Sequence, residues 1–359
     1  MNITHTIFAF NTGGTELMLT DIMFEQMKAG HNVTLIIINR SYNSSALSQL
    51  DSRIQIIYIN RPEGSHNPYW WLKYNFHLAK SHPDIVHFHQ KNAASFSIKF
   101  GKTKYIETTH ALNVDAQHNN GVDFRVAISP AVQADLLKRC YIQSTVVLNG
   151  IQTKRITHKS HSTSSTNAPF RIVLVGRLDH RIKGQHIVLQ ALHYIAQRHN
   201  STRSITLDII GDGDSKQYLS ELTKELNLTD KISFLGNQNR DFVYSHLADY
   251  HLFIQPSIEE GFGLSVAEAM TANTPVLVSN IDCLNAIIHN GIYGNSFKVN
   301  DRESCANAIT EIINNYSDAI TKAELAYNYA IQEFDISRTA KEYLNIYSNL
   351  IKQSSHKNE

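Results

Sequence analysis

The chain repeats one pattern, short apolar strands separated by helical stretches, and this pattern constrains its fold more than any other feature. In the first half, segments rich in β-branched and aromatic residues recur between helices. These predicted strands are 3–10, 31–39, 54–59, 84–89, 104–109, 124–129 and 144–149. The continuous apolar run of "HNVTLIIIN" is typical of a parallel strand that is covered on both faces. The alternation predicts an α/β fold with a doubly wound sheet.

The same alternation restarts after a polar interruption. Residues 152–169, "QTKRITHKSHSTSSTNAP", combine Ser, Thr, Asn and basic residues with almost no apolar ones, a composition typical of a flexible linker. Beyond it we expect strands at 171–176, 205–211, 232–236, 250–256 and 274–280, then C-terminal helices from about 303 to 353.

We therefore predict two Rossmann-like domains that face a central cleft. The predicted boundaries are 1–151 for an N-terminal domain, 152–169 for the linker and 170–340 for a C-terminal domain. Residues 341–359 form a C-terminal helix and polar tail that could pack back on the N-terminal domain. In such sheets ligands bind beyond the carboxyl ends of the strands.

Composition excludes several classes of protein. The 359 residues carry a net charge of +1, which gives no reason to expect a nucleic-acid partner. Residues 1–150 hold 13 Lys and Arg against 10 Asp and Glu, a mild excess that would suit an anionic membrane surface. Three widely spaced cysteines favour a reducing compartment. We read no signal peptide and no run of about 18 apolar residues, so we expect a cytoplasmic protein with at most peripheral membrane contact.

In the C-terminal half, cations and glycines follow the predicted strands. "VGRLDHRIKG" places Arg177 just after one strand and Lys183 at the next helix start. Because Arg offers a planar fork and Lys a point charge, the two together can hold a diphosphate, although a solvated surface pair is the alternative. "IIGDGD" adds a glycine turn that contains Gly213, which could also be only structural.

The segment "PSIEEGFGLSVAEAM" (256–270) carries the most specific pattern. Gly261, Phe262 and Gly263 lead into a helix whose first amides, at Gly263 and Leu264, could receive phosphate oxygens. Glu268 lies about one turn into this apolar helix, with no cation three or four residues away, so its partner must come from elsewhere or from a ligand.

Both carboxylates of this segment could accept hydrogen bonds from sugar hydroxyls. Glu268 would suit the vicinal hydroxyls of a ribose. Glu260, in the loop, could contact another part of the ligand, or could simply be a solvated loop carboxylate.

In the N-terminal half, Gly13 and Gly14 lie between a strand and a helix, where glycines let an anion approach free amides. The third glycine of a dinucleotide fingerprint is missing, so a plain tight turn is the alternative. His87, His89 and His110 lie at strand ends. A metal site would need a further ligand, and we predict none. For His110 we weigh an acceptor-side pocket against a packed core histidine.

These motifs, in this order, resemble those of the retaining glycosyltransferases of the GT-B fold, specifically family four. The resemblance covers nearly the whole chain. It rests on "NTGGTE", "PDIVHFHQ", "AISPAVQADL", "VVLNGI", "VGRLDHRIKG", "IIGDGD" and "EEGFGLSVAEAM". It implies a nucleotide-diphosphate sugar as co-substrate, normally without a metal or other cofactor.

The resemblance also implies roles for single residues. Glu268 would hold the donor ribose, and Arg177 and Lys183 the diphosphate. The segment "LDHRIKG" differs by one or two residues from the commonest form of this motif in the family. Arg181 is therefore an alternative to Arg177 as the phosphate ligand. Glu260 would contact the transferred sugar.

The remaining implied positions complete the site. His110 would line the sugar site on the acceptor side. The amides near Gly14, Gly263 and Leu264 would complete the phosphate cradle, and Gly13, Gly213 and Phe262 complete the donor-binding set.

The expected function is transfer of a UDP- or GDP-linked sugar to a glycan or lipid-linked acceptor, in the synthesis of a cell-surface polysaccharide such as lipopolysaccharide or capsule. Two rivals stay open. One is a GT-B-type sugar-nucleotide epimerase, and the other is a non-catalytic paralogue that acts as an assembly partner.

Overall fold

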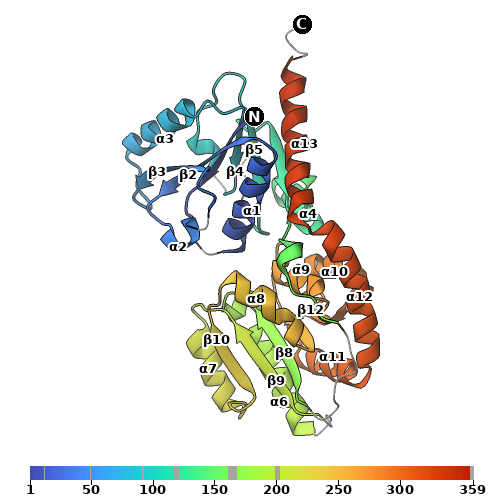
Figure 1. Cartoon of the computed structure of the whole chain (residues 1–359). Coiled ribbons are helices and arrows are strands. Elements are labelled where there is room, and N and C mark those ends of the chain that lie inside the picture. Colours follow the sequence, from blue (N-terminus) through green and yellow to red (C-terminus); the bar gives the residue numbers. More distant parts are fainter. Residues whose placement is uncertain are drawn as a thin grey trace. The chain divides into compact units, whose positions relative to one another are not determined.

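The computed structural model describes residues 1–11, 13–48, 50–90, 93–115, 121–160, 168–198 and 203–355. The chain divides into two compact units (Figure 1). Unit 1 comprises Met1–Ile151 and Asp335–Glu359, and unit 2 comprises Gln152–Phe334.

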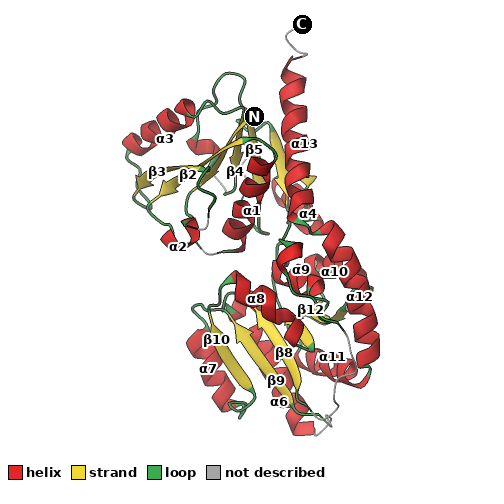
Figure 2. Cartoon of the chain, viewed as in Figure 1, coloured by secondary structure: helices red, strands yellow, loops and turns green. Residues whose placement is uncertain are grey.

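Unit 1 is built on a parallel sheet of seven strands in the order β3-β2-β1-β4-β5-β6-β7. The strands are β1 (Asn2–Ile7), β2 (Asn32–Asn39), β3 (Gln55–Arg61), β4 (Ile85–Phe88), β5 (Lys104–Thr109), β6 (Phe124–Ala127) and β7 (Thr145–Val146). The helices are α1 (Gly14–Lys28), α2 (Ser44–Leu47), α3 (Pro68–Lys80), α4 (Pro130–Cys140) and α13 (Ile336–Ser355) (Figure 2). The order is that of a doubly wound Rossmann sheet with one added strand.

The C-terminal helix α13 packs on unit 1. Its Tyr343 and Tyr347 are at most 1% exposed and share an apolar cluster with Ile3 of β1 and Ile22 of α1. Because this cluster already includes Ile336, the C-terminal helix joins the unit earlier than residue 341, where the sequence pattern placed its start.

Unit 2 repeats the architecture with a six-stranded parallel sheet in the order β10-β9-β8-β11-β12-β13. The strands are β8 (Phe170–Val175), β9 (Ile205–Ile210), β10 (Ile232–Gly236), β11 (Leu252–Gln255), β12 (Val276–Ser279) and β13 (Asn295–Phe297). The helices are α5 (His180–Lys183), α6 (Gln185–Arg198), α7 (Lys216–Glu225), α8 (Arg240–His246), α9 (Leu264–Thr271), α10 (Asp282–Ile287), α11 (Arg302–Asn314) and α12 (Tyr316–Glu333).

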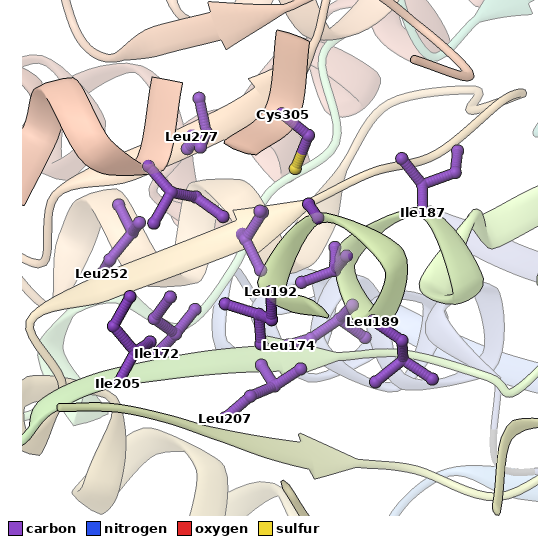
Figure 3. Packing of buried hydrophobic residues seen from close by; sticks show 14 of the residues in the cluster. Ile172, Leu174, Ile187, Leu189, Leu192, Ile205, Leu207, Leu252, Leu277 and Cys305 are labelled. Atoms are coloured by element: carbon purple, nitrogen blue, oxygen red, sulfur yellow. The ribbon is translucent and has the colours of Figure 1, made fainter. Parts of the chain in front are cut away.

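The core of unit 2 lies between its sheet and the helices α6 and α11 (Figure 3). Leu174 and Leu207 of the sheet meet Leu189 and Leu192 of α6, and Cys305 contributes from α11. Each fully buried aliphatic side chain stabilises the fold by roughly 1.5–3 kcal/mol relative to an exposed one. This core fixes the strand ends from which the loops of the site emerge.

Part of the predicted linker is fixed to unit 2. The amide of Thr157 donates to the Tyr244 carbonyl at 3.0 Å, and that of Lys159 to the Ala272 carbonyl at 2.9 Å. Residues 152–160 are therefore not a flexible connection, although their composition suggested one. Residues 161–167 lie outside the described part of the chain.

None of the helices in the described residues combines the length and the apolar character that crossing a membrane requires.

Candidate functional site

The loops after three adjacent strands of unit 2 carry many of the predicted donor-binding residues. β8 lies between β9 and β11, at the point where the strand order reverses. Gly176 and Arg177 follow β8, Gly213 lies in the loop after β9, and 256–263 follows β11. Because the carboxyl ends of parallel strands share one edge of the sheet, these loops meet where such sheets bind ligands.

Lys183 and Glu260 form an ion pair, with 2.5 Å between Nζ and Oε2. The two side chains are only 21% and 16% exposed. The hydroxyl of Ser257 donates to the same oxygen of Glu260 at 3.4 Å. The sequence suggested separate roles for Lys183 and Glu260 and gave no indication of this contact.

The pair forms because α5 packs directly against the loop after β11. The amides of Ile258 and Glu259 donate to the Ile182 carbonyl at 2.8 and 3.2 Å. Gly184, with φ of 66°, ends α5 in the left-handed region. A Cβ at Gly184 would lie 2.0 Å from the Pro256 carbonyl oxygen, so only glycine permits this approach.

Arg177 and Arg181 flank one carboxylate. Nη2 of Arg177 lies 3.7 Å from Asp179, and Nε of Arg181 lies 3.5 Å from it. The arginine side chains are 66% and 74% exposed, so both pairs are loose and solvent-screened. Either guanidinium can turn toward an anion at this edge, and the choice between Arg177 and Arg181 remains a prediction.

Gly213 sits where the loops after β8 and β9 touch. A Cβ at this position would lie 2.5 Å from the Leu178 carbonyl oxygen. Its amide donates to the Asp212 carboxylate at 2.8 Å. Gly213 therefore lets the two loops approach each other, and its N–H is already engaged. Its predicted contact with the donor remains untested.

The helix α9 begins at Gly263, which caps it in the left-handed region with φ of 99°. The amides of Gly263 and Leu264 have no acceptor among the described residues. A helix start with open amides is a ready anion site. Glu268 lies in the second turn of α9 and is half-buried, as is Leu264.

The loop before α9 is anchored by Phe262. Its ring is 5% exposed and contacts Phe334 edge-on, with 5.6 Å between ring centroids. Burial, with the charge of Glu260 as a second cause, raises the pKa of the Cys283 thiol well above its usual range. The protonated thiol donates to the Phe262 carbonyl, with Sγ 3.2 Å from the oxygen. In this structure Phe262 positions the start of α9 by packing.

Unit 1 holds a cavity of about 940 Å³ beyond the carboxyl ends of its strands. Phe8 lines it after β1, His89 and Gln90 line it after β4, and His110 lines it after β5. The cavity thus lies at the strand-order reversal of unit 1, between β1 and β4. His110 is half-buried and is placed where the sequence suggested, on a pocket.

The charged groups of this cavity are mostly acidic. Glu16, Glu63, Glu107 and Asp115 line it together with a single arginine, Arg61, among the described residues. The guanidinium of Arg61 already donates to protein oxygens, to the Ser65 carbonyl at 2.8 Å and to Asn39 at 3.0 Å. Glu107 is paired with Arg125. Carboxylates accept hydrogen bonds, so this lining suits a ligand rich in hydroxyl donors.

The Gly13–Gly14 turn lies at the start of α1, where Gly13 is the N-terminal cap. The Glu16 carboxylate folds back over this turn, because a Cβ at Gly13 would lie 2.5 Å from its Oε2. Negative charge in the first turn stabilises a helix. For the Gly14 amide to meet a phosphate, Glu16 must first turn away, and the role predicted for Gly13 and Gly14 remains a prediction.

From the interior to the wall of the cavity, four side chains form a hydrogen-bonded row that we call the histidine chain: Gln26, His5, His89 and His110. Nε2 of His5 lies 2.8 Å from Oε1 of Gln26, and Nδ1 of His5 lies 2.9 Å from Nε2 of His89. Nδ1 of His89 in turn lies 3.2 Å from Nε2 of His110. The chain runs from the interior of α1 across β1 and β4 to the cavity.

The rings of the histidine chain are neutral. Burial lowers the pKa of His5 and of His110 to about 4. Burial, followed by the neighbouring rings, lowers the pKa of His89 well below its usual range. A neutral imidazole has one N–H donor and one acceptor nitrogen.

Ligand atoms of His5, His87 and His89 lie within 4.8 Å of one another, which is compact enough for a metal ion. Each of the six ring nitrogens, however, has a hydrogen-bond partner. A metal ion would displace one such bond at every ring. The donor set therefore fits a hydrogen-bonded network better than a metal centre.

Sequence reasoning missed His5 and Gln26. His5 pairs in register with His87 on the adjacent strand, but this pairing is only visible once the strand order is known. Gln26 lies on the buried face of α1 and is fully buried, and no local sequence signal distinguishes it from a surface glutamine.

Two family models match the chain. Glycosyl transferases group 1 matches residues 157–332, and Glycosyltransferase Family 4 matches residues 12–155.

Curated relatives include an uncharacterized glycosyltransferase of Methanocaldococcus jannaschii, 30% identical over 49% of this chain and 44% of that protein. The phosphatidyl-myo-inositol mannosyltransferase of Mycobacterium leprae is 22% identical over 76% of this chain and 75% of its own length. The chain thus spans less than half the length of the first of these relatives.

Among solved structures, a glycosyltransferase from Rickettsia africae matches with a TM-score of 0.80 and 21% identity over 98% of both chains. Anabaena HepE, crystallised with UDP and glucose, matches with a TM-score of 0.79 and 20% identity over 97% of this chain and 99% of that chain. At these identities the likeness shows a shared GT-B fold.

Proposed function

Because the chain belongs to the glycosyltransferases of group 1 and family 4, we propose that it is a retaining, metal-independent enzyme that moves a sugar from a nucleoside diphosphate to an acceptor hydroxyl. The observation that carries this proposal is the Lys183–Glu260 pair beside the open amides that begin α9. Lys183, a cation that can bind phosphate, thus lies next to Glu260, a carboxylate that can accept hydrogen bonds from sugar hydroxyls.

The donor roles follow from this arrangement. Lys183 and Arg177, with the amides of Gly263 and Leu264, hold the diphosphate and stabilise its charge as the sugar leaves. Glu268 accepts hydrogen bonds from the ribose. Once a phosphate engages Lys183, Glu260 is released to accept hydrogen bonds from hydroxyls of the transferred sugar.

The reaction breaks the bond between the anomeric carbon and the phosphate oxygen, and forms one between that carbon and the acceptor oxygen. With retention, the acceptor hydroxyl attacks from the face of the leaving group. Its proton passes to the departing phosphate oxygen, so the protein need not supply a strong base. His110 in the unit 1 cavity contacts the sugar, and the hydroxyl-rich acceptor occupies the rest of that cavity.

The relatives narrow the choice of donor to be tested first. HepE was crystallised with UDP and glucose, and the mycobacterial relative is a mannosyltransferase. We place the reaction at the inner face of the plasma membrane, in the synthesis of a cell-surface polysaccharide on a glycan or lipid-linked acceptor.

The helix α3 supports membrane contact. Three apolar side chains on it are widely exposed, Tyr69 by 55%, Leu72 by 59% and Phe76 by 64%. The helix "PYWWLKYNFHLAK" also holds both tryptophans of the chain and two lysines, and no acidic residue. Aromatic side chains beside lysines suit the interface of an anionic bilayer.

A panel of UDP- and GDP-sugars tests the proposal. One or more should raise the melting temperature of the full chain, because a ligand that binds only the folded state stabilises it. Absence of both binding and donor hydrolysis across the panel would refute the function, and would favour the non-catalytic paralogue. An epimerase would instead convert a donor with no acceptor present, whereas the transferase needs an acceptor.

A further inference from the structure

The histidine chain connects a fully buried amide to the wall of the cavity. Gln26 and His5 are 0% exposed, and His89 is 2% exposed, whereas His110 reaches the cavity. Every link is a contact of 2.8 to 3.2 Å between single nitrogen or oxygen atoms. Since buried polar groups are strongly penalised when unpaired, each ring must match its neighbours in donor and acceptor character.

The direction of these hydrogen bonds follows from the amide. Oε1 of Gln26 can only accept, so Nε2 of His5 carries the hydrogen and its Nδ1 is an acceptor. Nε2 of His89 therefore donates to His5, which leaves Nδ1 of His89 as an acceptor. By the same step, Nε2 of His110 carries the hydrogen and donates to His89.

The consequence appears at the cavity. With its hydrogen on Nε2, His110 has an unprotonated Nδ1, and this atom has no hydrogen-bond partner among the described residues. Nδ1 of His110 therefore offers the cavity a hydrogen-bond acceptor, which can pair with a hydroxyl donor of a ligand. A carbonyl or phosphate oxygen at the same place would be left without a donor.

A second branch is consistent with this orientation of the Gln26 amide. Nε2 of Gln26 donates to the Tyr347 hydroxyl at 3.5 Å, and this hydroxyl lies 2.7 Å from Nδ1 of His87. Nε2 of His87 lies 2.7 Å from the Thr108 hydroxyl. With the amide NH₂ toward Tyr347, the phenol donates to His87, and His87 donates to Thr108. Both branches are then satisfied at once, and turning the amide over would reverse every bond in both.

We propose that Gln26 is a positioning residue that sets the tautomer of His110 through His5 and His89, so that Nδ1 of His110 accepts a hydrogen bond from a hydroxyl of the bound sugar. The tautomer itself is a property of unit 1, while the sugar as its ligand rests on the proposed function. The substrate group selected at this point is an uncharged hydroxyl.

The tautomer is measured directly by long-range ¹H–¹⁵N NMR of the full chain labelled with [¹⁵N]histidine. His110→Gln identifies the His110 signals. The expected wild-type spectrum shows a protonated Nε2 and an unprotonated Nδ1 at His110. A hydrogen on Nδ1 of His110 would overturn the proposal, and this measurement needs no substrate and no variant of Gln26.

Gln26→Met then removes the amide and keeps an unbranched side chain. Folded Gln26→Met should give a mixture of the two tautomers at His110, whereas an unchanged His110 spectrum would contradict the proposal. Gln26→Glu supplies an accepting oxygen again and should restore the Nε2–H form. Tyr343→Phe is the matched control, because Tyr343 is equally buried and ends the other branch, with its hydroxyl 3.2 Å from that of Thr108.

Binding separates this positioning role from general stability. Gln26→Met should weaken the affinity for the sugar nucleotide by roughly three- to tenfold, which is the scale of one neutral hydrogen bond. The affinity for the bare nucleoside diphosphate should be unchanged. Equal losses of affinity for both ligands would contradict the positioning role of Gln26. If no sugar nucleotide binds the wild type, the proposed function fails while the NMR result still decides the tautomer.

Discussion

Replacing Glu260 with glutamine should tighten the binding of a bare nucleoside diphosphate and slow sugar transfer. In this structure the Glu260 carboxylate pairs with Lys183 at 2.5 Å and so competes with any phosphate for that ammonium. Glutamine keeps the size and the accepting oxygen of the side chain but removes its charge. Lys183 is then more available to the diphosphate, while the sugar loses a charged acceptor for its hydroxyls.

The geometry sets the magnitude. A phosphate on the far side of the Lys183 ammonium would lie about 6 Å from the Glu260 carboxylate, where two unit charges repel by roughly 3 kcal/mol at an effective dielectric constant of about 20. Because both side chains retain some exposure, 21% and 16%, water reduces this value. We expect a net gain of about 1 kcal/mol, which is roughly a fivefold increase in affinity.

Isothermal titration with UDP and GDP at low and at physiological salt measures this effect. Glu259→Gln is the charge-matched control one residue away, and Lys183→Met should lower the affinity. The gain for Glu260→Gln should shrink as salt rises. Weaker binding of the diphosphate by Glu260→Gln than by wild type would refute the idea that the pair competes with the ligand.

Three further outcomes are expected. His5 has its pKa lowered from 6.5 to about 4 in the folded state, so the unfolded state takes up its proton first as the pH falls. Stability is therefore lost below about pH 6.5. Wild type should lose about 2 kcal/mol more than His5→Gln between pH 7.5 and 5 in denaturant titrations, and an equal loss would contradict this. Gly184→Ala should lower the free energy of unfolding by about 3 kcal/mol. The new Cβ would lie 2.0 Å from a backbone oxygen, and the residue would have to adopt a left-handed conformation. A loss of less than about 1 kcal/mol would rule out that clash. Leu72→Glu with Phe76→Glu should abolish cosedimentation with anionic vesicles, whereas Leu325→Glu, exposed by 48% in unit 2, should not. Loss of self-association in place of vesicle binding would identify α3 as a contact between copies of the chain.

Periodicity predicted the strands of both sheets except β13, because most strands of a parallel sheet are covered on two faces and so read as apolar runs. β13 (Asn295–Phe297) is a three-residue edge strand without such a run, and the sequence pattern did not predict it. The weakest case was 144–149, where only Thr145–Val146 pair as β7 at the edge of the sheet. The start of the C-terminal helix was placed too late, because Ile336 is recruited to unit 1 by packing that no local pattern records.

The contacts that matter most in the site join residues far apart in sequence. Lys183 and Glu260 were each identified, but their pairing depends on how closely Gly184 lets two loops approach. The histidine chain depends on strand order, since His5 and His89 come from β1 and from the end of β4, which are neighbours only in the folded sheet. Sequence indicated which residue types gather at the strand ends, and the tertiary structure shows which of them touch.

The most direct test of the whole account is the affinity of the full chain for its best sugar nucleotide, compared between wild type and Glu268→Ala. If unit 2 clasps the ribose with Glu268, binding should weaken roughly tenfold or more, as expected for one or two lost charge-assisted hydrogen bonds. An unchanged affinity in a folded variant would contradict the donor site proposed here.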